Sequence, residues 1–67
     1  MYYEINIAKD GKHFFATAER SITTEKELKK ALIVFQNKFP KEEGYEIIIT
    51  LEYPKTSYLL NIDDILE

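Results

Sequence analysis

The sequence has no cysteine and no tryptophan, and it contains a single histidine, His13. Without cysteine no disulfide can form, and the chain fits a reducing compartment. A structural zinc site in so short a chain draws on cysteine and several histidines, so a single histidine argues against one. The support that a small domain usually needs must therefore come from self-association or from a well-packed core.

Glycine and long apolar runs are also scarce. Gly11 and Gly44 are isolated, and neither opens a helix in a glycine-rich loop, so nucleotide binding is not indicated. No unbroken apolar run approaches the roughly 18 residues needed to span a bilayer. The segment that begins at Met1 has neither the basic region nor the apolar stretch of a signal peptide. We expect a cytoplasmic protein that does not contact a membrane.

What the sequence does contain is enough apolar surface for one core. Of the 67 residues, 45% are hydrophobic and 13% are aromatic, which is too much for a chain that stays disordered. The length leaves room for one domain only. We therefore expect a single small domain spanning residues 1–67, without a cleft between domains.

Apolar and polar residues alternate over residues 3–8, as in a strand with one buried face. Asp10-Gly11 follows, and this pair between two strand-like segments favours a hairpin, because a type I′ turn needs positive φ at both positions. In this register the facing pairs are apolar: Ile7 with Phe14 and Ile5 with Ala16. The same register places Tyr2 and Phe15 on the opposite face of the sheet.

A helix is expected to begin near Thr24. Thr24 and Glu27 have the spacing of a capping box, in which a hydroxyl and a carboxylate each bond a free backbone N–H. Apolar residues then form one stripe at helical spacing: Leu28, Ala31, Leu32, Phe35 and Phe39. The helix ends at Phe39-Pro40, because proline pushes the preceding residue out of the α region. Ile33 points away from the stripe.

Two further strands are expected after the helix. Residues 45–53 alternate, with a strongly apolar odd-numbered face and with Ile48 on the even-numbered face. Residues 57–62 predict a fourth strand, although adjacent Leu59 and Leu60 leave its facing ambiguous by one residue. Residues 63–66 add a helical turn.

Two hairpins that flank one helix predict an α+β fold of order ββαββ. The sheet has four strands, is mainly antiparallel and carries the helix on one face. The expected strand order is 2-1-3-4, all antiparallel, with strands 2 and 4 at the edges. The alternative order, 2-1-4-3, makes the central pair parallel.

No group of residues predicts catalysis or ligand binding. Nucleophilic catalysis needs an oriented base beside an activated nucleophile, and His13, the only histidine, follows a hairpin turn where we expect it to be solvated. Asp63, Asp64 and Glu67 are carboxylates that lack the spacing of a calcium loop. We expect a protein that is not an enzyme and has no metal, no cofactor and no small-molecule substrate.

The sheet face opposite the helix is the first candidate interface. Four residues should lie there: Tyr2, Phe15, Ile48 and one of Leu59 or Leu60. A contiguous apolar set on an uncovered sheet often marks a protein interface. The alternative is that residues 62–66 fold back and cover this face. Pairing of an edge strand with another chain is a second route to assembly, and a homodimer is one such assembly.

Charge is distributed unevenly along the chain. Residues 1–20 are balanced, residues 21–41 carry a net charge of +3 and residues 42–67 carry −6. The helix should present a basic outer face made by four residues: Lys26, Lys29, Lys30 and the exposed Ile33. A nucleic-acid-binding accessory protein that uses this face is the alternative function. The total charge of −3 disfavours it, because phosphate neutralisation dominates such binding, and a solvated helix face is the simpler interpretation.

A short, acidic, cysteine-free ββαββ chain without catalytic residues resembles the accessory proteins of phages and mobile elements, including inhibitors of host defence systems. The resemblance rests on size and composition and transfers no residue or activity. The main expectation is a non-enzymatic protein-binding module, an inhibitor or small regulatory protein, which acts through an exposed sheet face or an edge strand. Its partner is a protein that the sequence does not identify.

Overall fold

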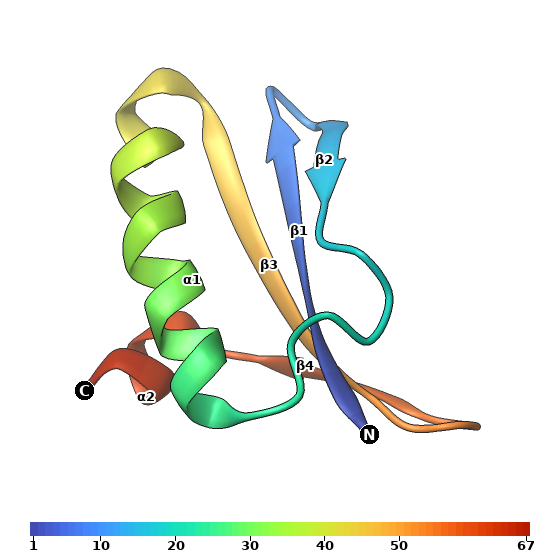
Figure 1. Cartoon of the computed structure of the whole chain (residues 1–67). Helices are drawn as coiled ribbons and strands as arrows, with labels where there is room; N and C mark the ends of the chain where they lie inside the picture. The colour runs from blue at the N-terminus through green and yellow to red at the C-terminus, as the bar shows by residue number, and fades with distance from the viewer.

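A computed structural model describes all residues, 1–67, and has a four-stranded antiparallel sheet, one main helix and a short C-terminal helix (Figure 1). The elements are β1 (Tyr2–Lys9), β2 (Lys12–Ala16), α1 (Glu25–Lys38), β3 (Tyr45–Glu52), β4 (Ser57–Leu60) and α2 (Ile62–Leu66). A short 3-10 helix, Lys41–Glu43, joins α1 to β3. The strand order is β2-β1-β3-β4, so the α+β class and the expected order are confirmed and the parallel alternative is wrong.

The first hairpin has the predicted turn but not the predicted register. Asp10 and Gly11 both have positive φ, 51° and 82°, as a type I′ turn requires. The expected pairing holds next to the turn, but Ile7 then pairs with Phe15 instead of Phe14. Phe14 is the extra residue of a β-bulge, and Ala16 pairs with Asn6, so the predicted pairings of Ile7 with Phe14 and of Ile5 with Ala16 are both wrong.

The bulge turns Phe15 toward the helix. Its ring centroid lies 5.6 Å from that of Phe35 in α1 and 6.3 Å from that of Phe39, which caps α1. The expectation that Phe15 lies on the sheet face opposite the helix is therefore wrong. Packing a phenyl ring on two others removes more apolar surface from water than leaving it among the carboxylates of the opposite face.

The core lies between α1 and the central strands. Six aliphatic side chains are buried: Ile5, Ile7, Ile22, Leu28, Leu32 and Ile49. They come from the odd-numbered faces of β1 and β3, from the predicted stripe of α1, and from the segment before α1. The core is small, so each of these side chains carries a large share of the fold's stability.

The start of α1 has the predicted capping box. The backbone N–H of Glu27 donates to Thr24 Oγ1 at 3.1 Å, and the Glu27 carboxylate accepts from the backbone N–H of Thr24 at 3.2 Å. The backbone N–H of Thr23 donates to the same carboxylate at 3.3 Å. Hydrogen bonds from Thr24 and Thr23 lower the pKa of Glu27, because they stabilise its charged form.

Replacing Thr24 with alanine should reduce the free energy of unfolding by about 1 kcal/mol, because the helix loses its side-chain cap. Glu27 has a lowered folded pKa, so its contribution is present above the unfolded pKa and is lost as the pH falls through the folded pKa. The cost of the substitution should therefore shrink in acid. Urea unfolding at neutral pH and at about pH 2, well below the ordinary pKa of glutamate, measures the difference. Equal costs at both pH values would contradict a role for the Glu27 carboxylate.

The C-terminal segment packs beside α1, not over the opposite face of the sheet. Ile62, Ile65 and Leu66 contact the core, and Figure 1 shows α2 next to α1. The Asn61 side chain accepts a hydrogen bond from the backbone N–H of Asp63 at 2.9 Å and so caps α2. The alternative in which residues 62–66 cover the free face of the sheet is wrong, because their apolar side chains complete the core.

Candidate protein-docking surface

Three of the four predicted interface residues lie on the face opposite α1, called the open face. Tyr2 pairs with Glu52 and Ile48 with Asn6, and Leu59 pairs with Thr50. This settles the facing of β4: Leu59 is on the open face and is 77% exposed. The open face is not a continuous apolar surface, because polar residues share it: Glu4, Asn6, Glu46, Thr50 and Glu52.

The open face is strongly acidic around Tyr2. The Tyr2 hydroxyl donates to the Glu19 carboxylate at 3.4 Å. Partial burial of the phenol raises the pKa of Tyr2, and the neighbouring carboxylates of Glu19, Glu4 and Glu52 raise it further. A hydrogen bond from the Ser57 hydroxyl lowers the pKa of Glu52, because it stabilises the charged carboxylate. Such a surface repels a phosphate backbone.

Phe15 belongs instead to a group of rings on the helix side of the sheet, which we call the aromatic patch. The patch consists of five residues: Phe14, Phe15, Phe35, Phe39 and Tyr45. Phe39 is at its centre, with ring centroids 5.8 Å from Phe14 and 5.2 Å from Tyr45. The patch therefore joins β2, the end of α1 and the start of β3 into one apolar surface.

Much of this surface is open to solvent. Phe14 is 53% exposed and Phe15 is 39% exposed, although both rings contact the ring of Phe39. In Figure 1, α1 and α2 lie on the β3 and β4 side of the sheet, and no helix covers β2. The rings of β2 therefore contact neighbouring rings while a large part of their surface stays exposed.

Helical geometry places Val34 beside this patch. Residues in a helix are rotated by roughly 100° from one to the next, so Val34 shares a side with Ala31 and Lys38, next to Phe35. Ile33 falls on the other side, toward Gln36, which faces Ile62. Val34 is 48% exposed and Ile33 is 55% exposed.

Three lysines lie near the aromatic patch, two in the first hairpin and one in α1. Lys9 Nζ lies 4.7 Å from the ring centroid of Tyr45, and Lys12 pairs with Lys9 across the hairpin. Lys38 is in the last turn of α1. Asp10 in the turn offsets one of these charges. The patch is thus apolar at its centre and basic on the sides of the first hairpin and α1, whereas Glu42 and Glu46 lie near it around the start of β3.

The second predicted surface is present on the outer face of α1. It carries Lys26, Lys29, Lys30 and Ile33. Lys29 Nζ forms an ion pair with Glu25 at 3.6 Å, which offsets one of the three positive charges. No aromatic residue falls on this side of the helix, so the face has no ring on which a base could stack.

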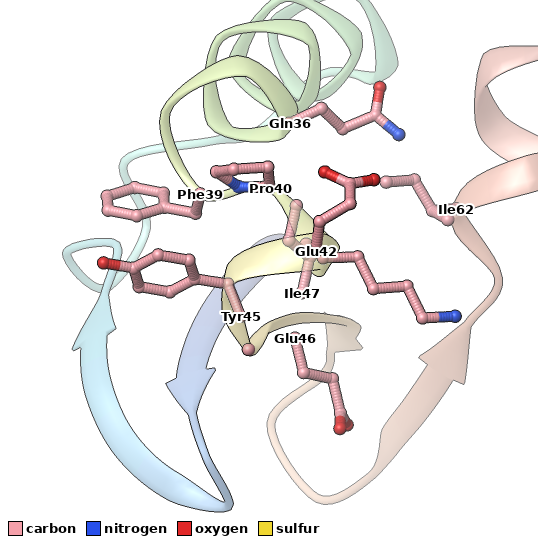
Figure 2. A pocket seen from close by; sticks show the side chains of 10 residues that line it. Gln36, Phe39, Pro40, Glu42, Tyr45, Glu46, Ile47 and Ile62 are labelled. Carbon is pink, nitrogen blue, oxygen red and sulfur yellow. The ribbon is translucent and has the colours of Figure 1, made fainter.

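A groove of about 500 Å³ continues the aromatic patch around the end of α1 (Figure 2). Figure 2 shows Phe39 and Tyr45 on one side and Ile62 on the other, with Gln36, Glu42 and Glu46 around the opening. No serine, threonine, cysteine or histidine lines the groove. Four of its ten lining residues are hydrophobic, and Lys41, Glu42 and Glu46 bring charged groups to its walls.

No group of three or more His, Cys, Asp or Glu side chains is placed to hold a metal ion. Neither α1 nor α2 has the length and apolar character that crossing a membrane requires.

A scan against protein-family models found no match for the chain, and searches of the curated proteins and of the solved structures found none either. Information on the function of the chain therefore comes from the surfaces of its fold.

Proposed function

We propose that the chain is a non-enzymatic protein-binding module, an inhibitor or small regulatory protein, that docks an acidic segment of a partner on the aromatic patch. The exposure of Phe14 and Phe15, whose rings contact Phe39 and Phe35, carries the proposal, and the exposed Val34 lies on the neighbouring side of α1. Contiguous exposed apolar surface is uncommon on monomers and marks interaction sites, and aromatic residues are enriched where binding energy concentrates.

The charge of the rim selects the partner. Lys9, Lys12 and Lys38 favour a segment that carries carboxylates, because complementary charge steers encounter and suppresses basic competitors. An apolar side chain of that segment would pack on Phe14 and Phe15. A neighbouring apolar side chain would enter the groove that begins at Phe39 and Tyr45, since Glu42 and Glu46 at its opening would repel a carboxylate. Because the chain has no cysteine, we also propose that it works in the cytoplasm.

Selection from a random linear-peptide display library tests the proposal. Peptides enriched on the wild-type protein should be acidic and should contain aromatic or leucine anchors. Phe14→Ser should weaken them at least about tenfold. Tyr58→Ser is the matched control, since Tyr58 is as exposed as Phe14, 53%, but lies on the opposite edge strand.

Three outcomes would contradict the proposal. The first is enrichment of basic peptides, and the second is equal weakening by Phe14→Ser and Tyr58→Ser. The third is tight binding of a single-stranded oligonucleotide that falls steeply with salt and depends on Phe14, which would assign the patch to nucleic acid.

A further inference from the structure

The two edge strands of the sheet differ in how well they are protected. β2 carries a bulge, and the chain after it bonds to β1: the N–H of Thr17 donates to Ile5 O at 3.0 Å, and the N–H of Tyr3 donates to Ile22 O at 2.8 Å. β4 has no bulge, no charged residue, no proline and no glycine. Natural edge strands use such features to prevent pairing with another chain, so β4 is the unprotected edge.

The free backbone groups of β4 belong to its odd-numbered residues. The N–H of Tyr53 donates to Thr56 O at 2.8 Å and so closes the hairpin as a hydrogen-bonded pair. Hydrogen-bonded and non-hydrogen-bonded pairs alternate in an antiparallel ladder. The N–H and C=O groups of Ser57 and Leu59 therefore point away from β3.

The extended segment is symmetric about Leu59. Asn61 follows β4 with φ −98° and ψ 126°, which is still extended backbone. The extended chain thus runs from Ser57 to Asn61 with Leu59 in the middle. Leu59 is also the most exposed large hydrophobic residue of the protein, at 77%.

We propose that β4 pairs antiparallel with β4 of a second copy, centred on Leu59, so that the two sheets become one. In this register the N–H and C=O of Leu59 bond those of Leu59 of the second copy. Tyr58 faces Leu60 of the second copy on the helix side, and the two Leu59 side chains face each other on the open face. All of these cross-strand pairs are apolar, and such pairs stabilise a sheet.

Charge at the ends of this interface is complementary. The two-fold symmetry brings Lys55, at the tip of the hairpin, toward the first turn of α2 of the second copy. That turn carries Asp63 and Asp64. Opposite charges at the rim fix the register and suppress slipped pairings.

The interface is small, so the dimer should be weak. Five extended residues from each copy bury much less than the roughly 1,200–2,000 Å² of a standard stable interface. We expect a dissociation constant on the order of 0.1 mM. The aromatic patch is on β2, at the other edge of the sheet, so the dimer is independent of the proposed function. The dimer would carry one aromatic patch at each of its two ends.

Light scattering or sedimentation equilibrium between about 10 µM and 1 mM tests the dimer, since this range brackets the expected dissociation constant. The mass should rise from the 7.9 kDa of the monomer toward twice that value. Leu59→Lys should hold the protein at the monomer mass, because it places two like charges opposite each other. Ile33→Lys is the control: it puts the same charge on an exposed apolar position of α1 and should leave the dimer intact.

Hydrogen exchange of the Leu59 amide tests the register in the unmodified protein. Its protection should increase with protein concentration. A monomer at every concentration would overturn the proposal, as would a dimer that survives Leu59→Lys. Loss of the dimer on Phe14→Ser, with no change on Leu59→Lys, would move self-association to the aromatic patch and overturn both proposals.

Discussion

Leu32→Ala should lower the free energy of unfolding by about 3 kcal/mol, because it removes a fully buried side chain and leaves a cavity. A domain of this size has a total stability of roughly 3–10 kcal/mol, so the variant should be partly or largely unfolded. No disulfide compensates for a loss in the core.

Urea unfolding followed by circular dichroism measures this effect. Ile33→Ala is the matched control on the neighbouring residue, which is 55% exposed, and it should cost less than about 0.5 kcal/mol. Similar costs at both positions would mean that the helix does not pack on the sheet through the face described here.

Val34→Glu should weaken the selected acidic peptides by about tenfold or more, whereas Ile33→Glu should change their affinity by less than about twofold. The two positions are adjacent in α1 and similarly exposed, and both substitutions replace an aliphatic side chain with a carboxylate. Helical geometry places only Val34 on the side of the aromatic patch. Glutamate favours the helix at both positions, so neither variant should unfold.

Fluorescence anisotropy of labelled peptides at low and high salt measures these affinities. The difference between the variants should shrink with salt, because part of it is repulsion between exposed charges. A larger loss from Ile33→Glu than from Val34→Glu would assign docking to the outer face of α1, with Lys26, Lys29 and Lys30, and would contradict the account.

Phe15 shows where prediction from sequence reaches its limit. The strands, the Asp-Gly turn and the capping box could be predicted because each depends on residues near in the chain. The bulge depends on packing between β2 and α1. The alternation of apolar and polar residues within the hairpin cannot predict this packing. A local signal existed: Phe14 and Phe15 are adjacent, and strict alternation would send one large ring to each face.

The candidate site was only partly predictable for the same reason. Tyr2, Ile48 and Leu59 lie on the open face as expected, since their positions depend on strand periodicity. The aromatic patch combines β2, the end of α1 and the start of β3, which are distant in sequence. The choice between Leu59 and Leu60 needed the pairing of β4 with β3, because two adjacent leucines fit either face.

The most direct test of the aromatic patch as the docking surface is a map of amide chemical-shift changes on titration with a selected acidic peptide. The largest changes should fall on Phe14, Phe15, Val34 and Phe35, with smaller ones along the groove beside Phe39. Changes concentrated on the open face around Ile48, or on Lys26 to Lys30 of α1, would contradict the proposed function.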